Sequence, residues 1–379
     1  MTLPIEELIP DYLRGLPVYI PGKPIEEVER ELNIRAIKLA SNENPLGPSP
    51  KAMEAVRAAL PESHRYPDGG TKVLREKLAK LRGVQFDEIF VGLGSSEIID
   101  LASRVFLRPG LAGLTSEGSY APFSTAIRAS GATLQLAKQR NFAFDLRAIV
   151  EAITAETRLI YLANPNNPTG TSFGAEEFAE FLGRVPANIL VVLDEAYIHY
   201  AARTDMPDSA GVFRTHKNLV TLRTFSKVYG LAGLRIGYAT GSAGLLAAMN
   251  KLRTPFNTSG LAQTAAIAAL DDHAHVKHSL ETNAAERRRI HEGLRELGLD
   301  PVPSDANFVF VEVGPMAKEF CEVLLRAGTI VRPLGWMGFP NAMRISVGTP
   351  AENDEFLSVM RKCWPAATRA AASAERIAR

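Results

Sequence analysis

Short apolar runs that alternate with helical patterns are the feature that most constrains the fold of this chain. Residues 159–163, 189–193 and 219–224 are such runs, and a helical pattern at 175–182 separates the first two. Strands without alternating polar and apolar side chains are buried on both faces, as in a parallel sheet covered by helices. We therefore predict an α/β fold with a mostly parallel central sheet and helices on both faces.

The length and the order of the patterns indicate two domains. A chain of 379 residues exceeds the usual size of one domain. Helices are predicted at 49–60, 71–82 and 97–107, whereas a long helix at 275–297 is followed by short strands and a last helix at 351–363, which is typical of a smaller α+β unit. We predict an N-terminal arm at 1–45 that partly joins the small domain, a large cofactor-binding domain at 46–265, a small C-terminal domain at 266–365 and a tail at 366–379.

The composition excludes several classes of protein. The chain has 43 Lys and Arg residues against 42 Asp and Glu residues, a formal charge of +1, so no overall field attracts nucleic acid or an anionic membrane. Its 2 cysteines cannot form a disulfide framework or a multi-cysteine metal site. No apolar run approaches the roughly 18 residues of a membrane span, and residues 1–9 lack the basic start of a signal peptide. We expect a cytoplasmic protein without a metal, nucleic-acid or membrane partner.

Glycine- and asparagine-rich segments follow two of the predicted strands. Open α/β sheets bind their ligands beyond the carboxyl ends of the strands. Residues 92–96 (Gly-Leu-Gly-Ser-Ser) can bind an anion at the start of a helix, although such a glycine turn is also a common structural element. Residues 164–170 (Asn-Pro-Asn-Asn-Pro-Thr-Gly) can form a rigid loop that aims asparagine amides, with an ordinary turn as the alternative.

Charged residues follow the two most apolar runs. Asp194 follows 189–193, and a buried carboxylate needs a cation or a protonated nitrogen, the alternative being a solvated loop acid. Lys227 follows 219–224 among small and apolar residues, which favours a lowered pKa and Schiff-base chemistry, although most lysines are solvated. Arg235, in the same glycine-bearing loop, can bind a phosphate. A ligand with a phosphate, an aldehyde and a ring nitrogen fits all of these segments, and pyridoxal 5′-phosphate is such a cofactor.

Six ordered motifs make the chain similar to the fold-type I, class II aminotransferases, which use pyridoxal phosphate. Among them it most resembles the histidinol-phosphate aminotransferases of histidine biosynthesis. The resemblance covers residues 19–349, and its most specific stretches are LASNENPLGPSP (39–50), RYPDGG (65–70), ANPNNPTG (163–170), VVLDEAY (191–197), TFSKVYGLAGLRIGY (224–238) and MRISVGT (343–349).

The resemblance implies a role for each matching residue around the cofactor. Lys227 would bind the aldehyde and later move a proton, Asp194 would pair with the ring nitrogen, and Tyr120 would stack on the ring. The phenolic oxygen would accept hydrogen bonds from Asn167 and Tyr197. The phosphate would be held by Gly94, Ser95, Ser96, Thr224, Ser226, Arg235 and, across the interface of a homodimer, Tyr66. Two positions depart from the family pattern: Ser96 stands where Asp is usual, and Glu117-Gly118-Ser119 precedes Tyr120 where Pro-Thr is common.

The resemblance also implies how two substrates share one pocket. Arg344 would bind the carboxylate of glutamate, Arg332 and Tyr19 would bind the phosphate of histidinol phosphate, and Asn42 would lie in a flap over the site. The alternative for Arg332 is a surface position on a strand. The alternative function is an aromatic amino-acid aminotransferase, which shares almost every motif and which the apolar segment 334–339 favours. A pyridoxal-phosphate-dependent decarboxylase of phospho-amino acids and a cofactor-binding regulator are further alternatives.

Overall fold

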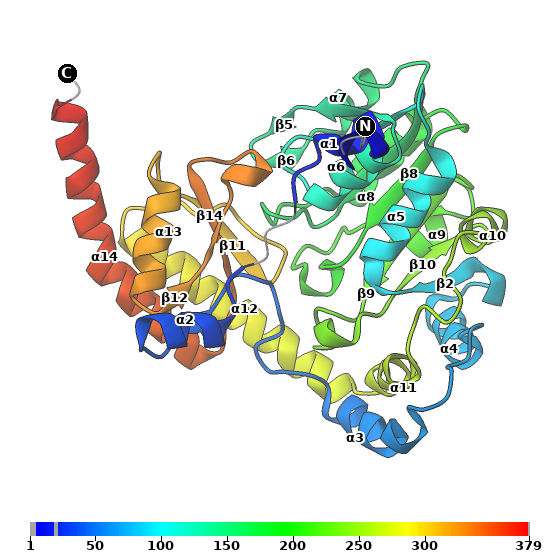
Figure 1. Ribbon diagram of the computed structural model, residues 1–379, viewed down its shortest axis with the longest axis horizontal. Helices are drawn as coiled ribbons and strands as arrows, with labels where there is room; N and C mark the ends of the chain where they lie inside the picture. Colours follow the sequence, from blue (N-terminus) through cyan, green and yellow to red (C-terminus); the bar gives the residue numbers. More distant parts are fainter. Residues whose placement is uncertain (1–4, 19–21, 378–379) are drawn as a thin grey trace.

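A large sheet and a smaller sheet, each with its own helices, lie side by side in the molecule (Figure 1). The computed structural model describes the backbone of residues 5–18 and 22–377 and the side chains of residues 7–18 and 22–364. The predicted α/β class is confirmed, because helices and strands alternate along most of this chain.

The large sheet has seven strands in the order β2-β10-β9-β8-β7-β3-β4. Neighbouring strands are parallel except at β10, which runs antiparallel to both β2 and β9. The predicted mostly parallel arrangement is therefore confirmed. The strands are β2 (Ile89–Gly92), β3 (Ala112–Ser116), β4 (Thr133–Ala137), β7 (Thr157–Ala163), β8 (Leu190–Asp194), β9 (Leu219–Thr224) and β10 (Gly237–Gly241).

Helices cover the large sheet, and its strands are apolar because their side chains are buried. Val191, Val192 and Leu193 in β8 are completely buried, since the sheet forms the centre of the largest apolar core. α5 (Gly94–Phe106) packs across β2, β7, β9 and β10. The other helices of this part are α3 (Pro50–Ala59), α4 (Lys72–Arg82), α6 (Ala121–Ala129), α7 (Leu146–Glu151), α8 (Ala175–Arg184), α9 (Ser209–Val212), α10 (Ala243–Asn250) and α11 (Gly260–Ala269).

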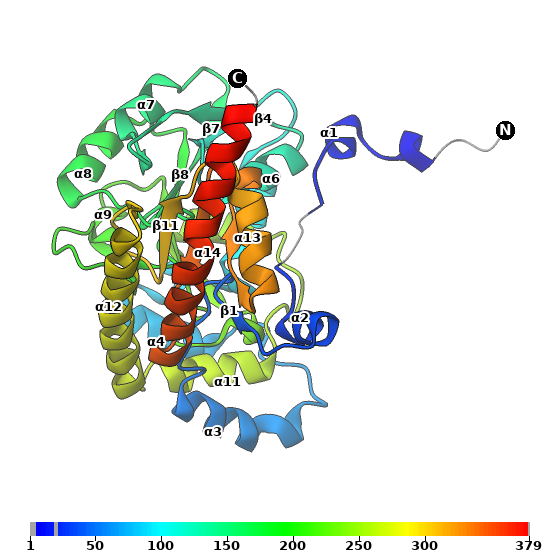
Figure 2. The same ribbon diagram turned by 90° about the vertical axis from the view of Figure 1, so that its left-hand side faces the viewer.

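The smaller part is built on an antiparallel sheet with the order β11-β14-β13. Its strands are β11 (Phe308–Glu312), β13 (Arg332–Pro333) and β14 (Ala342–Ser346). Its helices are α12 (His273–Glu296), α13 (Ala317–Arg326) and α14 (Pro350–Ile377). α14 packs against both α12 and α13 (Figure 2), and a second apolar core lies between these helices and the sheet.

The N-terminal segment contacts both parts. α1 (Asp11–Arg14) packs on α6 of the large part. After α2 (Ile25–Leu32), β1 (Ile37–Lys38) pairs in parallel with β12 (Thr329–Ile330) of the smaller part. The chain then returns to the large part at α3, where the Ser49 side chain caps the helix by accepting a hydrogen bond from the Ala52 N–H. A short hairpin of β5 (Gln139–Arg140) and β6 (Ala143–Phe144) completes the strands.

Several elements differ from the sequence prediction. α5 begins at Gly94 rather than at residue 97, so the glycine–serine segment lies inside the first helical turn. β3, β4 and β10 of the large sheet were not predicted. α14 continues to Ile377, although a helix end at 363 and a separate tail at 366–379 were predicted, since the alanine-rich sequence after Pro365 has a high helix propensity.

Candidate active site

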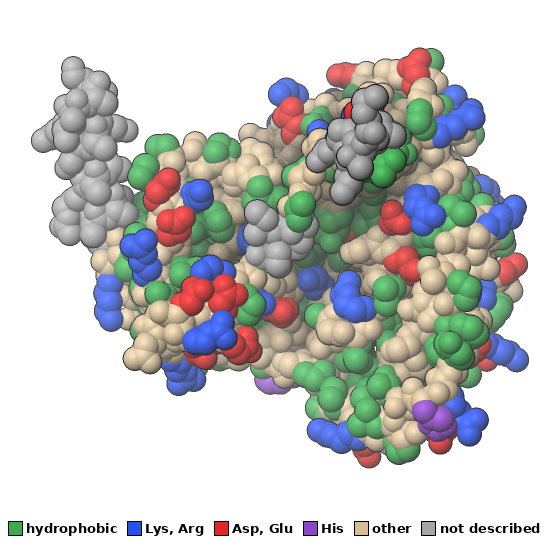
Figure 3. All heavy atoms as spheres, viewed as in Figure 1, with side chains coloured by type: hydrophobic (Ala, Val, Ile, Leu, Met, Phe, Trp, Pro, Cys, Tyr) green, Lys and Arg blue, Asp and Glu red, His purple; other side chains and the backbone are tan. Residues whose placement is uncertain are grey.

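A cavity of about 480 Å³ lies at the carboxyl ends of β7, β8 and β9, between the large sheet and the smaller one. In the space-filling view the surface is hollowed between the two parts, and basic side chains are visible in the hollow (Figure 3). The predicted site residues that line the cavity are Asn42, Ser95, Ser96, Tyr120, Asn167, Asp194, Tyr197, Thr224, Ser226, Lys227, Arg235, Arg332 and Arg344.

Asp194 is a buried carboxylate at the last position of β8. One carboxylate oxygen accepts a hydrogen bond of 2.9 Å from the Ala196 N–H. Burial raises the pKa of Asp194 from 3.8 to about 7, against the lowering effects of that hydrogen bond and of Lys227. A protonated nitrogen placed beside this carboxylate would offset the cost of burying its charge.

Lys227 extends into the same cavity from the turn after β9. Its Nζ donates a hydrogen bond of 3.0 Å to the backbone oxygen of Asn42 and lies 5.4 Å from the centre of the Tyr197 ring. Desolvation, and secondly the positive charge of Arg344, lower the pKa of Lys227 from 10.5 to about 8. The amine is therefore much closer to its neutral, nucleophilic form at neutral pH than an exposed lysine is.

One end of the cavity could hold an anion. The first turn of α5 contributes Ser95 and Ser96, whose backbone N–H groups belong to the positive end of a helix. Gly94 has φ +75°, and a Cβ at that position would lie 2.9 Å from the Nη2 atom of Arg235. Only glycine therefore allows the Arg235 guanidinium to approach this turn so closely.

The Tyr197 phenol also lines the cavity and is buried. Its oxygen accepts a hydrogen bond of 3.1 Å from Asn42 Nδ2 and a longer one of 3.5 Å from Asn167 Nδ2. Burial raises the pKa of Tyr197 above its usual value, whereas Arg344 and the Asn42 hydrogen bond act in the opposite direction. The ring packs edge-on against Phe308 of β11 at 5.1 Å, so both sheets hold it in place.

The two predicted substrate arginines lie beside each other on neighbouring strands of the smaller sheet. Arg332 of β13 and Arg344 of β14 are register partners, and both line the cavity. Arg344 donates hydrogen bonds of 2.6 Å to Asn167 Oδ1 and 2.7 Å to the Ala40 oxygen. The guanidinium of Arg332 lies 4.9 Å from the ring centre of Trp336, which also lines the cavity.

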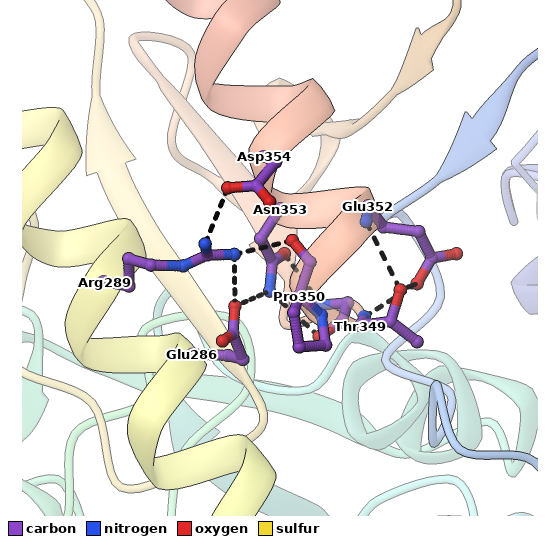
Figure 4. A network of polar contacts seen from close by, with 8 residues as sticks. Glu286, Arg289, Thr349, Pro350, Glu352, Asn353 and Asp354 are labelled. Atoms are coloured by element: carbon purple, nitrogen blue, oxygen red, sulfur yellow. Dashed lines mark hydrogen bonds and ion pairs between the residues drawn. The ribbon is translucent and has the colours of Figure 1, made fainter.

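A polar network fixes the chain just beyond β14 (Figure 4). The Asn353 side chain accepts a hydrogen bond of 3.0 Å from the Gly348 N–H and donates bonds of 2.9 Å to the Gly348 oxygen and 2.8 Å to Glu286. Arg289 donates to the same Glu286 carboxylate at 2.6 Å and also pairs with Asp354. α12 and α14 thus hold the turn that follows the strand carrying Arg344.

Two of the described residues that were predicted for the site, Gly94 and Tyr66, do not line the cavity. Gly94 lies at the start of α5, close to the Arg235 guanidinium. Tyr66 is 83% exposed and stacks on Phe256 at 4.7 Å, away from the cavity of its own chain. Tyr19 lies outside the described residues.

Sequence reasoning did not identify Ser346 or Asn307. Ser346 exchanges hydrogen bonds with Asn42, and the Asn307 side chain donates one of 3.1 Å to the Asn42 oxygen. The only sequence signal for Ser346 is its place in the MRISVGT motif, two residues after Arg344.

Comparisons with known proteins agree with this geometry. The family model for aminotransferase class I and II matches residues 34–360. The chain is 47% identical to histidinol-phosphate aminotransferase 2 of Pseudomonas aeruginosa over 353 residues, which cover 92% of this chain and 96% of the relative. It is 43% identical to the protein of the same name from Methylococcus capsulatus over 355 residues, 92% and 96% of the two chains.

A solved structure is similar over almost the whole chain. The crystal structure of histidinol-phosphate aminotransferase from Sinorhizobium meliloti in complex with pyridoxal-5′-phosphate has a TM-score of 0.87 and 30% identity, covering 94% of this chain and 98% of the other. An aspartate aminotransferase double mutant from Thermus thermophilus has a TM-score of 0.79 at 23% identity, covering 93% and 99%, which supports the fold alone.

Proposed function

Because this chain belongs to the class I and II aminotransferase family, we propose that it transfers the amino group of histidinol phosphate to 2-oxoglutarate, with pyridoxal 5′-phosphate as cofactor. This reaction is a step of histidine biosynthesis. The observation that carries the proposal is the neighbouring pair Arg332 and Arg344 at a cavity that Lys227 also lines. Two arginines can bind two different anionic groups, one from each substrate.

The residues of the cavity fit the cofactor at three separate points. The anion-binding end, formed by the α5 start and Arg235, suits a phosphate. Asp194 is a buried carboxylate whose charge a protonated ring nitrogen would balance. Lys227, with its pKa lowered to about 8, suits an aldehyde. When bound, the cofactor supplies an electron sink for the bond-breaking step at the donor carbon.

The chain's own residues then position groups and move a proton. Lys227 Nζ can accept the proton from the donor carbon near neutral pH, since its pKa is close to the working range of a general base. The Asn42 backbone oxygen, which accepts a hydrogen bond of 3.0 Å from this amine, holds it in position. Ser95, Ser226 and Arg235 would keep the phosphate fixed while the ring end reacts, so that the geometry of the proton transfer is preserved.

The substrates would bind through the smaller sheet. Arg344 would bind the carboxylate of glutamate, and its hydrogen bonds to Asn167 and Ala40 hold the guanidinium in one orientation. Arg332 would bind the phosphate of histidinol phosphate, with Trp336 stacked on its guanidinium. Tyr19 stays a predicted contact to the same phosphate.

A second candidate function is an aromatic amino-acid aminotransferase. Trp336 and Met337 give the cavity an apolar wall beside Arg332, which would suit a phenyl ring as well as an imidazole. Mixing the protein with histidinol phosphate or with phenylalanine, and following the spectral change of the bound cofactor, separates the two. A clear preference for phenylalanine would overturn the first proposal.

The proposal includes a homodimer. Tyr66 and Phe256 form an exposed aromatic pair, and Leu60 and Val73, close to Tyr66 in the sequence, are also exposed. Exposed apolar side chains that gather on one surface are typical of interfaces, and Tyr66 would there reach the phosphate in the other subunit. Light scattering after size exclusion should give about twice the 41.2 kDa of one chain, and Tyr66→Asp should reduce that mass.

We also propose a cytoplasmic location. The free thiols of Cys321 and Cys363 support it, because disulfides are rare in a reducing compartment.

Substitution of Lys227 tests the cofactor assignment directly. Lys227→Ala should remove the visible absorbance of the covalently bound cofactor and the transaminase activity, because no other described residue of the cavity is a lysine. Far-UV circular dichroism should stay unchanged. A variant that keeps the spectrum of the unaltered protein would refute the assignment.

A further inference from the structure

The hydroxyl of Tyr197 accepts hydrogen bonds from two asparagine side chains, Asn42 and Asn167. An amide side chain can present either its oxygen or its nitrogen to a neighbour, and the surrounding hydrogen bonds determine which one faces it. The role of the phenol, as donor or acceptor, therefore depends on what fixes the two amides.

Side chains of β14 fix both amides. Arg344 can only donate, and its 2.6 Å bond to Asn167 Oδ1 turns the Asn167 nitrogen toward the phenol. Ser346 acts on Asn42 in a different way. Its hydroxyl accepts a hydrogen bond of 2.8 Å from the Asn42 backbone N–H and donates one of 2.9 Å to Asn42 Oδ1. The Asn42 nitrogen is thereby turned toward the phenol.

With two N–H groups directed at its oxygen, the phenol has only its own hydrogen left to donate. No acceptor for this hydrogen lies within hydrogen-bond distance among the described residues, and Tyr197 lines the cavity. The hydrogen is therefore available to a ligand. Ser346 and Arg344 are two positions apart in β14, so they share one face of the strand and act on the same phenol.

We propose that Ser346 is a positioning residue that acts through Asn42 to make the Tyr197 hydroxyl a donor to the ring oxygen of the cofactor. The inference rests on the proposed function, because it requires pyridoxal phosphate in the cavity. Donation to this oxygen stabilises its deprotonated form. The hydroxyl of Ser346, which is buried, would thus influence the cofactor without touching it.

Loss of the Ser346 hydroxyl removes the constraint on Asn42. The Asn42 amide can then rotate and present its oxygen to the phenol. The Tyr197 hydroxyl would donate its hydrogen to this oxygen and no longer to the cofactor. The charged groups around the phenol and the Lys227 amine are Asp194, Lys227, Arg344, Glu43 and Arg235. A change at Ser346 leaves all of them in place, so a spectral effect would come from the hydrogen bond.

The test is a pH titration of the bound cofactor's visible absorbance in the loaded protein. Ser346→Ala should raise the pH midpoint of this titration by about one unit, the effect of one hydrogen bond to a charged acceptor. Tyr197→Phe should raise it at least as much. Ser346→Thr, which keeps the hydroxyl, should restore the original midpoint, and Ser346→Cys, with its weak donor, should give an intermediate value.

The double variant Tyr197→Phe/Ser346→Ala distinguishes positioning from a general loosening of the site. If Ser346 acts only through the phenol, its removal has no further effect once the hydroxyl of Tyr197 is gone. Ser103→Ala is the matched control, because Ser103 is a buried serine bonded to Tyr161 at 2.8 Å in the core. It should leave the midpoint unchanged, and thermal unfolding of the cofactor-free proteins shows whether each variant folds.

The outcomes separate the inference from the proposed function. If the unaltered protein does not bind pyridoxal phosphate, the proposed function is refuted. A loaded Ser346→Ala protein with the original midpoint, or equal shifts for Ser346→Ala in the presence and absence of the Tyr197 hydroxyl, would overturn the inference alone. Should Ser346→Ala not fold, an original midpoint in Ser346→Cys would overturn it in the same way.

Discussion

The polar network beyond β14 leads to a quantitative prediction for Asn353→Ala. Asn353 is fully buried, and its side chain makes two hydrogen bonds to Gly348 and one to the Glu286 carboxylate. A hydrogen bond between neutral groups contributes roughly 1 kcal/mol and one to a charged group roughly 2 kcal/mol, so the substitution should lower the free energy of unfolding by about 4 kcal/mol. At about 2 °C per kcal/mol for a long chain, the melting temperature should fall by roughly 8 °C.

Differential scanning fluorimetry on the cofactor-free protein measures this fall. Asp354→Ala is the matched control, because Asp354 is the neighbouring residue on α14 and pairs with Arg289 of the same network, but its side chain is 69% exposed. An exposed ion pair contributes at most about 1 kcal/mol, so this variant should melt within about 2 °C of the original protein. Equal melting temperatures for the two variants would refute the reasoning that the buried hydrogen bonds of Asn353 stabilise the protein more than the exposed ion pair of Asp354.

Two further predictions concern the site. In the cofactor-free protein, the raised pKa of Asp194 means that the folded state keeps a proton that the unfolded state releases above pH 3.8. Asp194 should therefore lower the free energy of unfolding progressively as the pH rises from about 4 to about 7, and its contribution should stay constant at higher pH. Melting temperatures measured across this pH range should show this decrease, and Asp194→Asn should lack it. An identical pH dependence in both proteins would contradict the raised pKa of Asp194. Arg332→Ala should raise KM for histidinol phosphate at least about tenfold, the loss of one charge-assisted contact, and KM for glutamate much less. Steady-state kinetics with both substrates test this, and similar losses for the two would exclude a phosphate role for Arg332.

The cofactor residues could be predicted from the sequence because their signals are local. Asp194 directly follows apolar residues that are completely buried, and strand ends in such sheets converge on the ligand. Lys227 and Arg235 are likewise close in sequence to β9. Each of these predictions needs only a strand and the residues after it.

The network around Tyr197 could not be predicted in this way. Asn42 and Ser346 are 304 positions apart, and the backbone hydrogen bond from the Ser346 N–H to the Leu39 oxygen, just after β1, brings their segments together. β10 was missed for a related reason. Its sequence, Gly-Tyr-Ala-Thr-Gly, has little strand propensity, and its conformation comes from hydrogen bonds to β2 and β9 on both sides. Both the network around Tyr197 and the strand β10 thus depend on hydrogen bonds between segments that are far apart in the sequence.

The position of Ser346 beside Arg344 also limits how the specificity of such an enzyme can be redesigned. β13 and β14 form an obvious module for exchange, because they carry both arginines proposed to bind substrate. On the proposed roles, however, one face of β14 serves donor recognition and the electronic state of the cofactor together. Grafting a foreign hairpin to obtain a new amino donor would then also shift the pH range in which the enzyme works, unless the serine is retained. Selection acting on one of these traits would change the other, so the two should have diversified together.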